Sequence, residues 1–166
     1  SAQQIFQQQY ALGSQFPLYF ALLAGAIGIA SVSNAYWVMR WGMRRLCVLA
    51  LSGIGVLSTV FVLIALAYQG HPPLWALMAY LFPVFFCIGL LFGNLNALAM
   101  EPLGHIAGLG AGVVGFVSTL ISVPVGVSIG QLYNGSVIPL VAGFAVLAGL
   151  ALGVVRWVDG RLAQQE

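Results

Sequence analysis

The sequence predicts an all-α protein, a bundle of five helices that cross a lipid bilayer, and three observations lead to this fold class. Of the 166 residues, 61% are hydrophobic. Only 5% are charged, with five arginines, three acids and no lysine, whereas a soluble domain carries about 25% charged residues. The apolar residues also form five long runs, each close to the roughly 20 residues that a helical span needs. This composition excludes a soluble enzyme, a nucleic-acid-binding protein and a disordered chain.

Each apolar run is predicted to form one span, and the five together a transmembrane bundle over residues 16–158. The connections between the runs are short, so neighbouring helices are expected to be antiparallel. The expected spans cover residues 16–38, 46–68, 74–98, 110–132 and 138–157.

The two ends of the chain are more polar than the runs between them. Residues 1–15 are rich in glutamine and are predicted to form an outer loop or the end of a preceding helix, and residues 159–166 a cytoplasmic tail. The first stretch lacks the basic region and the cleavage pattern of a signal peptide. Because residue 1 is not a methionine, we expect the chain to begin partway through a longer protein.

All five arginines fall on one side of the predicted bundle. Arg40, Arg44 and Arg45 lie between the first two spans, and Arg156 and Arg161 follow the fifth span, which an odd number of crossings returns to the same side. Because loops rich in positive charge stay in the cytoplasm, this side is predicted to be cytoplasmic and the start of the chain external. We therefore expect a multi-pass protein of the cell (inner) membrane.

Polar side chains are unevenly shared among the spans. The fifth span has none between residues 139 and 155, and the second has only hydroxyls, which can bond to their own helix. Amides are costly in hydrocarbon unless they are paired or hydrated, so the first, third and fourth spans are expected to face the bundle interior or a watery cavity. Interhelical hydrogen bonds are the alternative. The candidates for lining a substrate cavity are Asn94, Asn96, Ser118, Thr119 and Ser122.

The fourth span is dense in glycine and contains one proline. The pairs Gly108/Gly112 and Gly126/Gly130 have the four-residue spacing that lets helix backbones approach closely. Pro124 removes one helical hydrogen bond and is predicted to kink the span. These features suit a helix that slides against a neighbour, and they equally suit a static tight crossing.

Two constellations resemble chemical sites. The residues around Ser128 match the G-x-S-x-G pattern of serine hydrolases, but that serine needs a strand-to-helix turn, and here a helix is expected. A glycine packing face explains this match better. Glu101 and His105 could relay a proton or form a capped turn that Pro102 begins. Two such residues are too few for a metal site, so no metal ion is expected. No cofactor is expected either.

The loop after the first span resembles the loop that joins the second and third helices in each half of major facilitator superfamily (MFS) transporters. In the family, a glycine precedes an Asp-Arg-x-Gly-Arg-Arg/Lys core. Arg40, Gly42 and Arg44 match this core, whereas Met39 replaces the aspartate and Asn34 the glycine. This degenerate form is similar to the loop between helices 8 and 9. Residues 93–108 resemble the helix 10–11 junction of the bacterial drug/proton antiporter branch (Bcr/CflA-like).

The resemblance implies that the chain is helices 8–12 of such a transporter, with the end of helix 7 in residues 1–15. In that fold, helices 7, 8, 10 and 11 line the cavity, and those present here are the three spans richest in polar residues. It also implies that residues at the cytoplasmic side act as a gate or loop. These are Asn34, Arg40, Gly42, Arg44, Arg45, Glu101 and His105.

The function that the resemblance implies is export of drug-like or amphiphilic small solutes by alternating access, with coupling to protons and a role in antibiotic resistance. The expected partners are the lipid bilayer, the missing N-terminal half, a small-molecule substrate and protons, with no nucleic acid. The alternative is a non-transporting membrane subunit or scaffold that packs on a partner membrane protein. The coupling acids of the family lie mainly in the absent half, so the segment alone is not expected to transport.

Overall fold

The computed structural model describes residues 5–162, apart from the side chains of residues 105, 159 and 162. Within this part the structure is all-helical and contains no strand, which confirms the predicted fold class. Five of the helices are long and apolar enough to span a membrane. They are α2 (Phe16–Trp41), α3 (Met43–Ala67), α4 (Leu74–Met100), α5 (Ala107–Gln131) and α6 (Ile138–Leu162).

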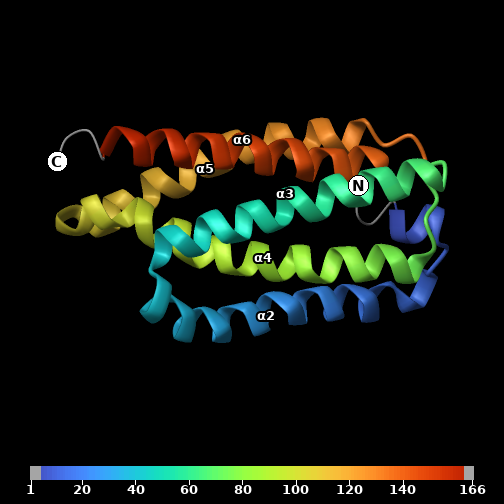
Figure 1. Cartoon of the computed structure of the whole chain (residues 1–166), viewed down its shortest axis with the longest axis horizontal. Helices are drawn as coiled ribbons and strands as arrows, with labels where there is room; N and C mark the ends of the chain where they lie inside the picture. Colours follow the sequence, from blue (N-terminus) through green and yellow to red (C-terminus); the bar gives the residue numbers. More distant parts are fainter. Residues whose placement is uncertain (1–4, 163–166) are drawn as a thin grey trace.

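The long helices lie nearly parallel to one another, in the spatial order α2, α4, α3, α6 (Figure 1). The closest packing is between α3 and α6, between α2 and α4, and between α3 and α4. In contrast, α5 touches its neighbours at few points, and no residue in its most apolar stretch is buried. Four helices therefore form a packed unit, and α5 is attached to its side.

Short helical segments lead into and connect the spans. A π-helical turn, Ile5–Gln9, and a 3-10 turn, Gly13–Gln15, precede α2, and another 3-10 helix, η3 (Glu101–Ile106), joins α4 to α5. Only Gly42 separates α2 from α3. Its φ of 76° is in a region that favours glycine, and this conformation lets the chain reverse direction within one residue.

At the end of the bundle away from the arginines, three segments meet at Gly70. The carbonyl oxygen of Gly70 accepts hydrogen bonds from the Gln9 side chain, at 3.0 Å, and from the Val137 backbone, at 3.1 Å. The Tyr10 hydroxyl donates to the carbonyl of Pro72. Burial raises the pKa of Tyr10 to about 12, so this hydroxyl keeps its proton at neutral pH. These bonds tie the N-terminal segment to the α3–α4 and α5–α6 connections.

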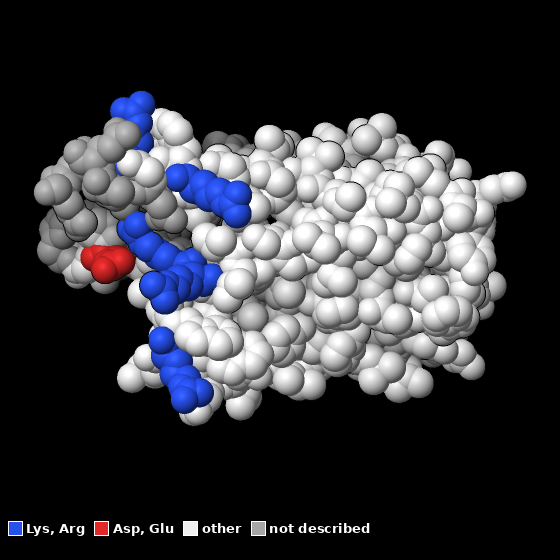
Figure 2. Space-filling view, in the orientation of Figure 1, with Lys and Arg blue, Asp and Glu red and all other residues white. Residues whose placement is uncertain are grey.

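The arginines gather at the opposite end of the bundle, where Glu101 also lies (Figure 2). Two of them stack on aromatic rings: Arg40 lies 5.5 Å from the ring centre of Tyr36, and Arg161 lies 5.1 Å from that of Trp157. Apart from the atoms drawn in grey, the remaining surface in this view carries no charge (Figure 2). This separation is the one that the sequence predicts for a membrane protein. The assignment of this end to the cytoplasm remains a prediction.

Candidate functional site

A stripe of small residues brings α2 against α4. Ala26 and Ala30 are fully buried, and they stand four residues apart on one face of α2. Gly89 of α4 lies against Ala30, and an added Cβ at Gly89 would be 2.7 Å from the Ala30 Cβ and 3.0 Å from the Ile27 Cα. Such distances leave no room for a side chain at residue 89. The two backbones therefore make a close crossing, of the kind that small residues permit in membranes.

The same stripe continues to an amide pair, Asn34 on α2 and Asn94 on α4. The Asn94 amide nitrogen donates to the Asn34 side-chain oxygen, at 2.7 Å, and to the Leu90 carbonyl, at 2.8 Å. The Asn34 amide nitrogen donates back to the Asn94 oxygen, at 3.3 Å. Asn94 is only 2% exposed. These bonds favour an interhelical role for Asn94, and its predicted contact with a substrate cavity stays a prediction.

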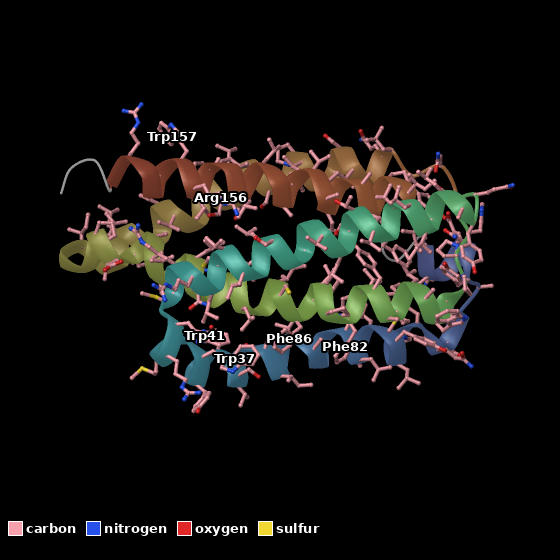
Figure 3. The ribbon with its side chains drawn as sticks, viewed as in Figure 1. Trp37, Trp41, Phe82, Phe86, Arg156 and Trp157 are labelled. Atoms are coloured by element: carbon pink, nitrogen blue, oxygen red, sulfur yellow. The ribbon has the colours of Figure 1, made fainter. Side chains whose placement is uncertain are left out.

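Aromatic side chains extend the α2–α4 contact toward the arginine end. Trp37 stacks on Trp41 one turn further along α2, with ring centres 5.8 Å apart. Trp37 also meets Phe86 of α4 edge to face, at 5.9 Å. Figure 3 shows these rings between the two helices, with Phe82 one turn away on α4. The contact therefore combines small residues, an amide pair and aromatic rings.

Asn96 lies on a different side of α4 from Asn94. At about 100° per residue, two positions along a helix turn a side chain by about 200°. Accordingly Asn96 is exposed, and its amide donates to the Phe92 carbonyl of its own helix, at 2.8 Å. The structure thus separates two asparagines that the sequence analysis grouped as cavity lining.

The three candidate residues on α5 are all exposed. Ser118, Thr119 and Ser122 fall on neighbouring positions of one helical face, and the Thr119 hydroxyl donates to the Gly115 carbonyl, at 2.8 Å. Thr119 also borders a shallow hollow of about 290 Å³ whose other walls are apolar or aromatic side chains of α5, among them Phe116. These hydroxyls do not contact Asn94 in this structure.

The glycines of α5 face open space along most of the helix. An added Cβ would meet nothing within 4 Å at Gly108, Gly112 or Gly126. The backbone is instead crowded at Gly110, where a Cβ would lie 2.9 Å from the Leu103 Cβ of η3. The helix runs without interruption through Pro124, and Gly130 is half-buried near its end. The sequence predicts that these glycines pack closely against another helix. That role stays a prediction, and it concerns a helix from another part of the protein.

The residues that suggested chemistry sit in ordinary helical settings. The Ser128 hydroxyl donates to the Pro124 carbonyl on the same helix, at 2.8 Å. Glu101 is exposed in the first turn of η3, and the side chain of His105 is outside the described part. Among the described side chains, no group of three histidines, cysteines or acids is placed to hold a metal ion. The free cysteines, Cys47 and Cys87, are buried and half-buried.

A second polar link, between α3 and α4, was missed by the sequence analysis. The hydroxyls of Ser58 and Tyr80 are 2.8 Å apart, and both residues are buried. The Tyr80 ring also stacks on Phe61, with ring centres 4.4 Å apart and planes 8° from parallel. The sequence predicts that the hydroxyls of α3 bond to their own helix, and Thr59 does so with the Gly55 carbonyl, whereas Ser58 bonds to Tyr80 of α4. The available signal was a lone tyrosine within an apolar run, about two turns from the start of α4.

Comparison with known proteins gives one weak similarity. The chain is 24% identical over 156 residues to an uncharacterized MFS-type transporter, YdgK, of Bacillus subtilis (strain 168), and the alignment covers 93% of this chain. It covers 35% of the relative, so the chain spans about a third of that protein's length. No protein-family model matches the sequence, and no solved structure matches it. Together with the five apolar helices, this similarity suggests a multi-pass membrane protein of transporter type.

Proposed function

We propose that this chain is the C-terminal half of a secondary active transporter of the major facilitator type. The complete protein exports drug-like or amphiphilic small solutes by alternating access, with coupling to protons. The similarity to an MFS-type transporter supports this proposal because it extends over nearly the whole chain. The observation that carries it is the exposure of α5, a helix with a row of hydroxyls that no other part of residues 5–162 covers.

The exposed face of α5 has the composition of a site for amphiphilic solutes. Such sites are mostly apolar and aromatic, with a few polar groups that orient the ligand. On α5, Ser118, Thr119 and Ser122 provide hydroxyls, and Phe116 and Leu120 provide apolar area close to them. In the complete transporter this face lines the central cavity, and the missing half closes it on the other side.

The packing of the other helices is suited to alternating access. The α2–α4 crossing at Gly89, the Asn34–Asn94 pair and the Ser58–Tyr80 link join three helices through close contacts and interhelical hydrogen bonds. A unit of this kind rocks as one body instead of deforming. Transport in this family of mechanisms depends on such motion of one half against the other.

A scaffold or non-transporting subunit is the alternative because an exposed apolar helix also suits a lasting contact with a partner protein. Cysteine accessibility in the full-length protein distinguishes the two. In a background with Cys47→Ala and Cys87→Ala, single cysteines are placed at residues 96, 118 and 122. Leu150→Cys is the control, because Leu150 is exposed on α6, a helix without polar residues in its middle.

We expect a membrane-impermeant thiol reagent to label positions 96, 118 and 122 and not position 150. Labelling rates should change when a proton gradient is imposed, because alternating access opens the cavity to one side at a time. A scaffold predicts labelling that is independent of the gradient, or no labelling until the partner is removed. If positions 118 and 122 behave like position 150, α5 faces lipid and the cavity proposal is wrong.

A further inference from the structure

A small apolar cavity lies inside the bundle, between α2, α4 and α6 and against the π-helical turn Ile5–Gln9. Its volume is about 50 Å³. Every described side chain in its wall is apolar, and four of them are the rings of Phe6, Phe20, Phe85 and Phe144. Protein interiors are close-packed, and voids larger than a water molecule are few. The cavity is therefore a distinct feature of this fold.

The wall of the cavity is held in place from several directions. Phe6 and Leu23 are each only 1% exposed, and Leu77 is fully buried. The turn that carries Phe6 is tied to the connection between α3 and α4 by the hydrogen bonds of Gln9 and Tyr10. The cavity is therefore preformed, and a ligand can enter it without first rearranging the turn.

The cavity is closest to the surface at Phe20, the most exposed side chain of its wall, at 46%. The rings of Phe6, Phe16 and Phe20 form a chain from the buried wall to this point, with ring centres 6.0 Å and 5.7 Å apart. The neighbouring exposed side chains of α2, Leu18 and Leu22, are also apolar. Because α2 is long and apolar enough to span a membrane, a solute dissolved in the bilayer reaches the cavity past Phe20.

The composition of the wall decides the chemistry of a ligand. No side chain in it donates or accepts a hydrogen bond, whereas a buried water needs about two to four polar partners. A polar or charged ligand would lose its hydration without compensation. An engineered apolar cavity of roughly 150 Å³ stays dry and binds benzene or xenon, and this cavity has about a third of that volume. It therefore suits an apolar ligand smaller than a benzene ring.

We propose that this cavity binds a small, uncharged apolar solute drawn from the bilayer, such as xenon or a short hydrocarbon. Dispersion contacts with the phenylalanine rings stabilise the ligand, because an unfilled void leaves its lining without contacts on one side. The site does not depend on the transport proposal, since its wall contains none of the candidate residues of α4 and α5 that would line a central cavity.

The test uses crystals of the purified full-length protein pressurised with xenon, whose anomalous scattering locates each bound atom. Two neighbouring leucines of α2 provide matched variants, because Leu23 lines the cavity whereas Leu22 is 50% exposed and does not. Leu23→Phe fills the cavity, and Leu22→Phe adds the same ring outside it. Leu23→Ala enlarges the cavity, and Leu22→Ala is its control.

We expect a xenon atom beside Phe6 and Leu23 in the unmodified protein and a xenon atom at the same place in Leu22→Phe, but none there in Leu23→Phe. Benzene in solution should raise the thermal unfolding temperature of Leu23→Ala and not that of Leu22→Ala, because a ligand stabilises only the protein that binds it. This second pair keeps the test decisive if Leu23→Phe does not fold.

The proposal is wrong if the cavity of the unmodified protein holds no xenon, whether it is empty or filled by a side chain of the segment before Ile5. Retention of xenon in Leu23→Phe would also overturn it. Equal effects of benzene on Leu23→Ala and Leu22→Ala would have the same meaning, because they would trace the effect to the detergent and not to the cavity.

Discussion

The close crossing of α2 and α4 makes a sharp prediction about Gly89. An alanine there would place its Cβ 2.7 Å from the Ala30 Cβ, 3.0 Å from the Ile27 Cα and 3.1 Å from the Ile27 carbonyl oxygen. Two of these atoms are backbone, so relief requires α2 to move. Overpacking of this kind costs about 1–3 kcal/mol. Alanine also favours the helix over glycine by about 1 kcal/mol, which offsets part of the loss.

The matched control is Gly93→Ala, one turn further along the same face of α4. There the new Cβ would be 3.9 Å from the Asn34 amide nitrogen, an ordinary contact, so only the helix-propensity gain remains. We therefore expect Gly89→Ala to be less stable than Gly93→Ala by about 1–3 kcal/mol. Ala30→Gly should rescue Gly89→Ala in part, because the contacts with the Ile27 backbone persist.

Unfolding of the purified protein by sodium dodecyl sulfate in mixed micelles, followed by circular dichroism, measures these differences. Thermal loss of the monomer peak in size-exclusion chromatography provides a second measure. If Gly89→Ala and Gly93→Ala unfold at the same detergent fraction, α2 and α4 do not approach as closely as the structure shows. The reasoning about small residues at this crossing would then be wrong.

Two further predictions concern the links between segments. In a double-mutant cycle with Asn34→Ala and Asn94→Ala, the coupling energy should be about 0.6–1.7 kcal/mol, and a value near zero in the same unfolding assay would show that the amides act separately. Gly70→Ala should destabilise more than Gly135→Ala by about 1–3 kcal/mol. Both glycines have φ near 85°, but only at Gly70 would the Cβ meet Ser136, at 2.5 Å from its Cβ. Ser136→Gly should remove this difference. If Gly70→Ala and Gly135→Ala destabilise the protein equally while Ser136 is present, the close contact between Gly70 and Ser136 is wrong.

The polar residues show where prediction from sequence succeeded and where it failed. The distribution of polar residues singled out α2, α4 and α5, and the Asn34–Asn94 pair joins the first two of these helices, whereas the hydroxyls of α5 are exposed. The sequence-based grouping of Asn94 with Asn96 ignored the helical repeat. Side chains two positions apart on a helix point to nearly opposite faces. Phase alone would have separated these side chains. It would not have identified Asn34 as the partner, because that depends on how two helices cross.

The glycines show the same limit from the other direction. The frequent glycines of α5 predict close helix packing, yet Gly108, Gly112 and Gly126 face open space in the structure. The tight crossing is at Gly89, in a helix where glycine is less frequent. The signal was present as Ala26/Ala30 and Gly89/Gly93, two pairs with four-residue spacing. Small residues at this spacing permit a second helix to approach closely. Whether a second helix does so depends on which helices are neighbours in the fold.

The five spans, the all-α class and the gathering of arginines at one end were determined by the sequence alone. The physical reason is that a membrane helix satisfies its backbone hydrogen bonds internally, so each span is specified by the hydrophobicity of its own residues. The pairing of Asn34 with Asn94, the Ser58–Tyr80 link, the contact at Gly89 and the exposure of α5 were decided by the tertiary structure. These features depend on which helices are neighbours and on how each helix is rotated about its own axis. Contacts between residues far apart in the chain determine both.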